Sequence, residues 1–213
     1  VAVYELPAID SKQTISYSVL GDATVRIQTK LEPGREDLPE LPKYGMLMQL
    51  PQAFNLVEWL GRGPFENYWD RKTAAFVGRY QATVDELYYP YASPQETGNR
   101  EDVRWVSLSN IYGVGLLVAG DPLLNFTALH YTPEDLTQQA RGTMHSYDLA
   151  KRNFVSLSID YKQMGVGGDN SWGARTHEEY TLPARNYEFS FYLKPFADAT
   201  NLEALAKRKY RIK

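Results

Sequence analysis

The chain has 213 residues, a formal net charge of −3, 43% hydrophobic residues and no cysteine. This length allows one large all-β domain with a substantial core. The mildly acidic balance gives no electrostatic case for binding nucleic acid or an anionic membrane, and the lack of cysteine excludes disulfides and thiolate metal sites. No signal peptide and no apolar run long enough to span a bilayer can be recognised in the sequence.

Apolar and polar residues alternate along most of the chain, which is typical of strands with one buried face. Gly21 and Asp22 fit a hairpin turn between the first two strands, and three prolines make 32–43 a loop. Strands are expected at 14–20, 24–31, 44–50, 55–60, 103–109, 115–119, 123–129, 154–161 and 187–193. Short helical turns are expected at 70–75, 132–138 and 201–207, with Thr132 as an N-cap. Nothing marks a domain boundary, so we expect one sandwich-like or barrel-like domain over 1–213.

The segment 162–174 combines four glycines with an Asp, an Asn, a Ser and a Trp, directly after a predicted strand. Glycines let the backbone approach a ligand closely. Trp172 could offer a flat apolar face to a sugar ring, while Asp169 and Asn170 bind hydroxyl groups. The alternative is a glycine-rich hairpin whose Trp covers the core, and composition alone leaves both open.

Two further loops, 61–72 and 88–100, are rich in charged and aromatic residues. In the first, Glu66 or Asp70 paired with an arginine could simply stabilise the loop, or the charges could form a polar binding lip. In the second, Glu96 and its neighbours could bind hydroxyl groups or remain a solvated surface. Exposed ion pairs contribute only about 0–1 kcal/mol, so stability alone is a thin reason for this concentration of charge.

The three histidines, His130, His145 and His177, do not have the spacing of metal ligands, and His130 is expected to have a structural partner. Hydrolysis of a glycosidic bond needs two carboxyl groups that face each other across the bond. The glycine-rich loop carries a single carboxylate, Asp169. It therefore suits a wall of a substrate site better than the acid and base of a reaction.

Three motifs resemble, in the same order, the C-terminal small-chain domain of glycoside hydrolase family 2 β-galactosidases. They are 61–71, 94–98 together with 102–105, and 164–172, and the resemblance covers about 41–196. It implies an antiparallel β-supersandwich similar to galactose mutarotase. It also implies that the catalytic glutamates and a divalent metal ion belong to a separate barrel domain of the same polypeptide, so this chain would hold no catalytic residue, no cofactor and no metal ligand.

Carried over to this sequence, the resemblance makes Trp172 the residue that reaches into the barrel and stacks on a β-galactoside. Asp169 and Asn170 would orient its loop, and Glu66, Asn67 and Glu96 would form a further polar lip. The family usually has Asp where this chain has Asn170, and Asn where it has Thr97. The first difference argues against a role that needs charge at position 170, but leaves the Trp unaffected.

The resemblance implies the C-terminal part of a bacterial β-galactosidase, soluble in the cytoplasm or periplasm, that acts with retention and is inactive without its barrel. The chain has no initiator Met, and the family domain begins earlier. We therefore expect missing first strands, an exposed sheet edge and self-association into a homo-oligomer. The alternatives are a free-standing carbohydrate-binding module, or an aldose 1-epimerase that uses His130 or His145 with Glu96. A purely structural domain would be favoured by a buried Trp172.

Overall fold

The computed structural model describes residues 1–137, 145–170, 172–197 and 201–208. The strands are β1 (Ala2–Leu6), β2 (Ser11–Val19), β3 (Val25–Pro33), β4 (Lys43–Pro51), β5 (Leu56–Gly63), β6 (Phe76–Thr83), β7 (Arg100–Ser109), β8 (Gly115–Leu129), β9 (Phe154–Gln163) and β10 (Tyr187–Phe196). The helices are short: α1 (Val84–Leu87), α2 (Pro133–Thr137), α3 (Leu202–Lys207), and the 3-10 turns η1 (Pro7–Ile9), η2 (Ser146–Asp148) and η3 (Glu178–Tyr180). The named strands pair antiparallel. The all-β, antiparallel prediction is therefore confirmed, whereas the mutarotase-like supersandwich and the single domain stay predictions.

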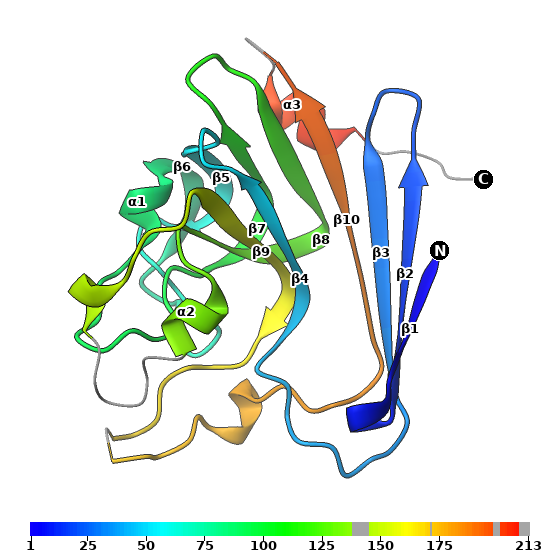
Figure 1. Ribbon diagram of the computed structural model, residues 1–213, viewed down its shortest axis with the longest axis vertical. Helices are drawn as coiled ribbons and strands as arrows, with labels where there is room; N and C mark the ends of the chain where they lie inside the picture. Colours follow the sequence, from blue (N-terminus) through cyan, green and yellow to red (C-terminus); the bar gives the residue numbers. More distant parts are fainter. Residues whose placement is uncertain (138–144, 171, 198–200, 209–213) are drawn as a thin grey trace.

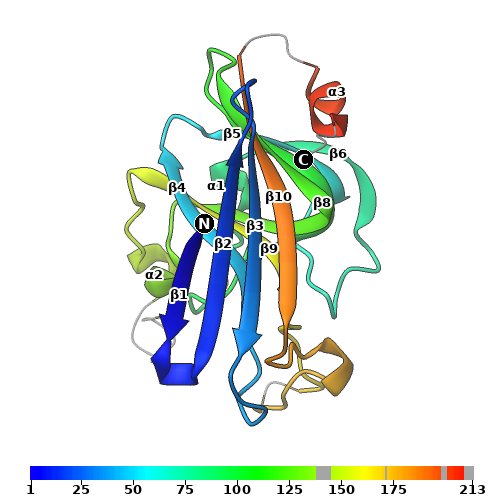
Figure 2. The same cartoon turned by 90° about the vertical axis from the view of Figure 1, so that its right-hand side faces the viewer.

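The long strand β8 divides the sheet into two branches. Its first half, up to Asp121, pairs with β10, whereas residues 125–129 pair with β9. One branch therefore runs β10-β3-β2-β1 and the other β9-β4, while β7-β5-β6 continue from the opposite side of β8. Figure 1 shows β4 and β9 beside the branch that contains β10 and β3. Figure 2 shows the β10-β3-β2-β1 branch face on.

The main hydrophobic core lies between the two branches. Phe191 of β10 is fully buried and Phe189 is 3% exposed. Opposite them, β9 contributes side chains with no exposed surface: Val155, Leu157 and Ile159. Burial of each such side chain contributes about 1.5–3 kcal/mol. The core thereby fixes where β9 ends, and with it the point at which the glycine-rich loop leaves the sheet.

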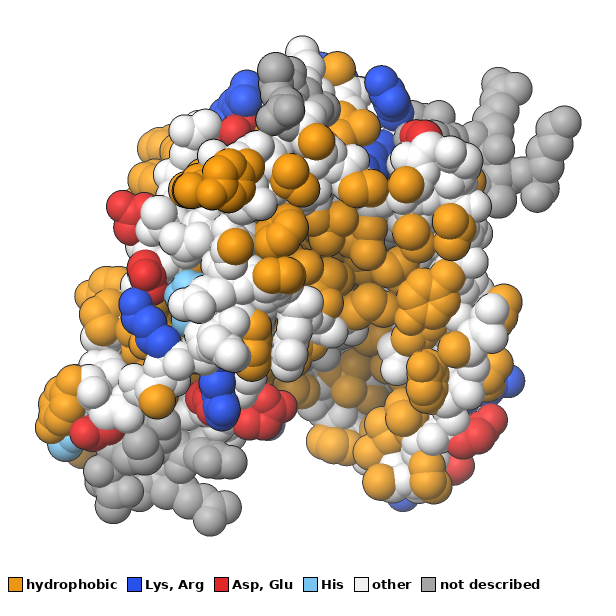
Figure 3. Space-filling view, turned by 45° about the horizontal axis from the view of Figure 1, so that its top comes forward, with side chains coloured by type: hydrophobic (Ala, Val, Ile, Leu, Met, Phe, Trp, Pro, Cys, Tyr) orange, Lys and Arg blue, Asp and Glu red, His pale blue; other side chains and the backbone are white. Residues whose placement is uncertain are grey.

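One side of this core is open. Among the described residues, β4 pairs with β9 alone and β1 with β2 alone, so both are edge strands. Figure 3 shows a hollow that is lined by hydrophobic side chains. Hydrophobic side chains that are only partly buried against the core include Leu6, Val25, Met46, Met48 and Leu193. β4 is thus an edge strand among the described residues, and the missing first strands and the self-association stay predictions.

The sequence pattern misplaces several elements. The expected strands 115–119 and 123–129 form one continuous strand, β8, and the patterns do not predict β6 or α1. The helix expected at 70–75 is wrong, because this segment begins inside a tight turn closed by hydrogen bonds between Tyr68 and Arg71. The other two expected helices are confirmed as α2 and α3, although Gln138 lies outside the described residues. No helix among the described residues is long and apolar enough to cross a membrane.

We expect the chain to associate with itself through the free edge of β4. Replacing Leu47, which is 48% exposed on β4, by lysine places a charge on this edge and should reduce association. The matched control is Val77→Lys, a residue of equal exposure on the edge strand β6, which should leave association unchanged. Sedimentation velocity over a concentration series measures this. A chain that stays monomeric throughout, or a Leu47→Lys variant that associates like the parent, contradicts the prediction.

Candidate functional site

The glycine-rich loop starts from a fixed position at the end of β9. The backbone N–H of Met164 donates to the Pro42 carbonyl oxygen at 3.0 Å, and that of Gly165 donates to Tyr180 at 2.8 Å. In Figure 1 the loop and η3 lie at the lower end of the molecule, beyond the strands. The outgoing limb of the loop is thus tied to Pro42 and to the returning end at Tyr180.

Close packing at the base of the loop explains two of its glycines. A Cβ atom on Gly168 would collide with the carbonyl oxygen of Ala174, on the returning limb. A Cβ atom on Gly165 would lie 2.5 Å from Thr176 Oγ1 and 2.8 Å from Asp70 Cγ. Side chains at these positions would force the two limbs apart, so the sequence holds the loop narrow by omitting them.

The tip of the loop presents Trp172 to solvent. Its side chain is 93% exposed, and its backbone N–H donates to Asn170 Oδ1 at 2.8 Å. Gly173 follows with φ of +99°, a conformation that favours glycine. The carboxylate of Asp169 lies 2.8 Å from His177 Nε2, across the loop. Trp172 therefore does not cover the core, and the condition for a purely structural Trp is not met.

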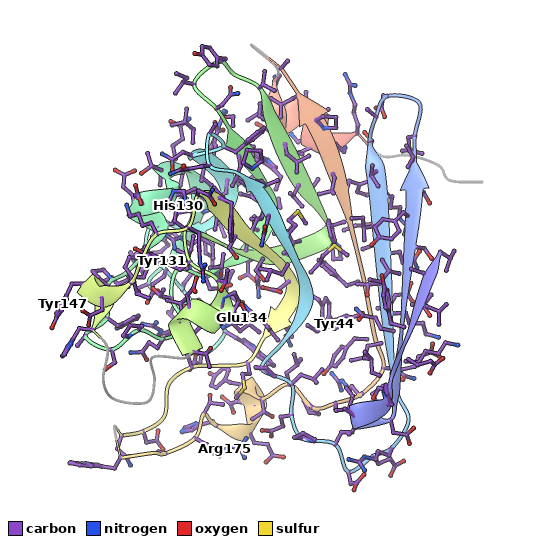
Figure 4. The ribbon with its side chains drawn as sticks, in the orientation of Figure 1. Tyr44, His130, Tyr131, Glu134, Tyr147 and Arg175 are labelled. Carbon is purple, nitrogen blue, oxygen red and sulfur yellow. The ribbon has the colours of Figure 1, made fainter. Side chains whose placement is uncertain are left out.

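Arg175 adds a further tie between the loop and the body of the molecule. It forms an ion pair with Glu40 in the connection between β3 and β4. Figure 4 places Arg175 at the lower end of the molecule, well away from His130, Tyr131 and Tyr147. A hollow lies against the loop. It is lined by Asp70, Arg71, Gly167, Gly168, Asp169, Thr176, His177 and Tyr180. The exposed indole is thus carried by a loop with several side-chain contacts.

Glu66 joins the two charged loops that sequence analysis singled out. Its Oε2 accepts hydrogen bonds from the Gly98 backbone N–H at 2.7 Å and from Thr97 Oγ1 at 3.1 Å. Its Oε1 accepts from Arg71 Nη2 at 2.7 Å and from the Tyr91 hydroxyl group. The side chain of Glu66 is only 8% exposed. The carboxylate thus fastens 61–72 to 88–100.

The same contacts set the charge state of Glu66. Burial alone would raise the pKa of this carboxyl, but the hydrogen bonds from Gly98, Tyr91 and Arg71 and the positive charge of Arg71 outweigh burial and lower the pKa below its ordinary value of 4.5. Glu66 is therefore a carboxylate at neutral pH. A carboxylate with four partners is suited to holding the loops together.

The other two residues of the expected polar lip differ in exposure. Asn67 is fully buried, and its side chain donates to the Phe65 carbonyl oxygen and accepts from the Glu101 backbone N–H. The side chain of Glu96 is 32% exposed and lies 3.7 Å from Lys43 Nζ. It borders a hollow with Arg71, Tyr91 and Gln163. Of the three lip residues, Glu96 therefore has the most access to a ligand in this chain, and the binding role of all three stays a prediction.

The histidines are placed without a common centre. His130 is 5% exposed and its Nδ1 lies 3.0 Å from the Phe154 carbonyl oxygen, so it has the structural partner that was expected. His145 stacks on the Tyr147 ring at the surface, with ring centroids 4.9 Å apart. The partners of these two histidines are Phe154, Tyr147 and Asp148, whereas Glu96 pairs with Lys43. The geometry therefore does not favour the epimerase alternative.

The sequence analysis named Asp70 and His177 but did not predict their contacts with the loop. Asp70 Oδ2 accepts backbone hydrogen bonds from Val166 at 2.9 Å and from Gly167 at 2.7 Å. His177 pairs with Asp169. Sequence position gives no sign of these contacts, since Asp70 lies 96 residues before Val166. The only available signal was that 61–72 and 162–174 are both rich in polar residues that need partners.

Comparison with known proteins gives consistent matches along nearly the whole chain. The family model described as "Beta galactosidase small chain" matches residues 1–193. Three relatives are each named beta-galactosidase. The protein of Priestia megaterium is 44% identical, and the match covers 85% of this chain and 17% of that protein. The protein of Vibrio cholerae is 38% identical, over 91% of this chain and 18% of that protein. The protein of Streptococcus thermophilus is 31% identical, over 91% of this chain and 19% of that protein. The chain thus spans less than a fifth of the length of these relatives.

Replacing Glu66 by Gln should lower the free energy of unfolding at pH 7 by about 1–3 kcal/mol, because charged hydrogen bonds to buried partners are lost. A lowered pKa stabilises the fold at a pH above the ordinary value of 4.5, and this contribution is lost as the pH falls through the folded-state pKa. The difference between the parent and the variant should therefore shrink in acid. Urea unfolding at several pH values measures it.

The matched control is Glu32→Gln, which removes a charge from the exposed Lys30–Glu32 pair on β3. This variant should have little effect, because exposed ion pairs contribute little to stability. Equal unfolding curves for Glu66→Gln and Glu32→Gln would show that Glu66 does not have the stabilising role assigned to it.

Proposed function

The chain belongs to the family of β-galactosidase small chains, and we propose that it provides the substrate-contacting Trp loop of a β-galactosidase. The catalytic carboxylates of this enzyme would lie in a barrel domain elsewhere in the same polypeptide. The enzyme would cleave terminal β-D-galactosides with retention, as a glycoside hydrolase of family 2. In this division of labour the present chain binds and positions sugar, and it does not break the bond.

The exposure of Trp172 is the observation that carries this proposal. Single exposed hydrophobic side chains are common on protein surfaces. Trp172, however, is 93% exposed on a loop whose limbs are tied to Pro42, Tyr180 and Asp70. A mobile tip would need none of these ties. An indole held in a defined place is what stacking on the C–H face of a pyranose requires.

The neighbours of Trp172 support the same role. Asn170 accepts the Trp172 backbone N–H, and Asp169 pairs with His177, so both residues order the tip from within. Their remaining hydrogen-bonding capacity would face sugar hydroxyl groups once substrate is bound. The family resemblance places an aspartate at position 170. The amide oxygen of Asn170 can accept the same backbone hydrogen bond without a charge.

Glycoside hydrolysis needs an acid and a nucleophile or base on either side of the bond, and three carboxylates near the loop in the described part of the chain already have other partners. Asp169 is held by His177, Asp70 by two backbone N–H groups, and Glu66 by four partners. The divalent metal ion that the family resemblance implies would belong to the barrel, and no step proposed for this chain uses it.

In an intact β-galactosidase that carries this chain, Trp172→Ala should raise KM about two- to twelve-fold with kcat little changed. Stacking contributes about 0.5–1.5 kcal/mol beyond burial, and uniform loss of ground-state and transition-state binding appears in KM. Steady-state kinetics on a chromogenic β-galactoside measures this. The control is Tyr147→Ala, since Tyr147 is 79% exposed but far from the loop. Unchanged kinetics in Trp172→Ala would refute the stacking role.

The isolated chain should not hydrolyse a chromogenic β-galactoside, because it would lack the catalytic carboxylates. The assay should use chain purified from a host without endogenous β-galactosidase. Activity that follows the protein through successive columns and disappears in the Trp172→Ala variant would place the catalytic groups within these 213 residues, contrary to the proposal.

A further inference from the structure

The Asp70 carboxylate binds the backbone of the glycine-rich loop from a segment that lies almost a hundred residues earlier in the chain. Asp70 lies in the connection between β5 and β6, at the apex of the turn between Tyr68 and Arg71. Its Oδ2 accepts two consecutive backbone hydrogen bonds, from Val166 at 2.9 Å and from Gly167 at 2.7 Å. Hydrogen bonds to an ionised acceptor are stronger than neutral ones, so this single side chain fixes the outgoing limb of the loop.

The loop is shaped to admit this carboxylate. A Cβ atom on Gly165 would lie 2.8 Å from Asp70 Cγ, and a Cβ atom on Gly167 would lie 3.2 Å from Oδ2. Larger residues at either position would push the loop away from Asp70. The glycines therefore permit a close approach at the site where the carboxylate binds the backbone.

The turn that carries Asp70 is itself held on both sides. The next residue, Arg71, donates to Glu66 and to Tyr91, and its guanidinium lies 4.8 Å from the centre of the Tyr68 ring. The preceding residue, Trp69, packs edge-on against Tyr180, at the returning end of the loop, with ring centroids 5.8 Å apart. The turn thus contacts the outgoing limb through Asp70 and the returning end through Trp69.

From this geometry we infer that Asp70 is a positioning residue for Trp172. It holds the outgoing limb of the loop at Val166 and Gly167, while the contacts of Asp169 and Asn170 carry that order to the tip. Asp70 does not touch the sugar in this scheme. The catalytic consequence rests on the proposed function of Trp172, whereas the ordering of Trp172 can be measured in the chain alone.

The first experiment measures the order of Trp172 in the isolated chain by ¹⁵N relaxation of its backbone and indole N–H groups. The Trp172 signals are assigned by their loss in Trp172→Phe. In the parent chain we expect order parameters near those of rigid backbone, about 0.85, and in Asp70→Ala a fall below about 0.6. Asp70→Asn keeps one acceptor oxygen and should give an intermediate value.

The matched control is Asn110→Ala. Asn110 Oδ1 also accepts two backbone hydrogen bonds, from Tyr112 at 2.9 Å and Val114 at 3.1 Å, in the connection between β7 and β8. This variant should leave the Trp172 order parameters unchanged. Thermal unfolding of each variant confirms that it is folded. If Asp70→Ala and Asp70→Asn both leave Trp172 as ordered as in the parent chain, the inference is wrong.

The second experiment is a double-mutant cycle in the intact enzyme. Asp70→Ala should raise KM by no more than Trp172→Ala does, with kcat little changed, and should add nothing further in the Trp172→Ala background. An additive increase would mean that Asp70 acts elsewhere and would overturn the inference. A Trp172→Ala enzyme with unchanged KM would refute the proposed function, while the relaxation data would still decide the positioning role of Asp70.

Discussion

The Glu66 carboxylate is the interaction on which the functional end of this molecule depends. Strand pairing holds the sheet together, but 64–72 and 88–99 lie outside the named strands. One nearly buried carboxylate provides four contacts there, to Gly98, Thr97, Arg71 and Tyr91. Its partners lower the pKa of Glu66 despite its burial, so the contacts persist with full charge at neutral pH. Removing it would take one charged acceptor from four donors, among them the buried Gly98 backbone N–H, and this costs more than the loss of a single bond.

The order of dependence runs outward from the core. The packing of β9 against β10 fixes the start of the glycine-rich loop. Glu66 fixes Arg71, and the turn that contains Arg71 presents Asp70 to Val166 and Gly167. The first step is apolar packing, the second is an ion pair within one loop, and the third binds the backbone of a distant segment. Rigid strands thereby give precision to residues that lie on irregular loops.

The sequence predicted the fold well where alternation was regular and failed where the chain departs from it. The strands β2, β3, β4, β9 and β10 follow their patterns because each has one face on the core. β6 escaped because it is an edge strand with little buried surface and an internal Gly78. The capping box formed by Thr83 and Glu86 is a sequence signal for the start of α1.

The candidate site could likewise be predicted only in part. Its residue types singled out the segment with Asp169, Asn170 and Trp172, but they left open whether Trp172 covers the core, and only its exposure in the structure answers this. The contacts of Asp70, His177 and Glu40 were not predictable, because each joins segments that only the folded chain brings together. Periodicity describes a strand and its neighbours, and it carries no information about which loops meet beyond the end of the sheet.

A loop ordered before it meets its ligand has a thermodynamic consequence. Immobilising a side chain on binding costs about 0.5–1.5 kcal/mol, which is comparable to the gain from stacking one ring on another surface. An indole on a mobile loop would therefore bind a sugar with little net gain. If Trp172 stacks on a sugar as proposed, the contacts from Asp70, Asn170 and His177 would place that cost in the folding of the chain. Whether stacking on the exposed Trp172 would raise the affinity for a sugar thus depends on how well the contacts of the loop order it before binding.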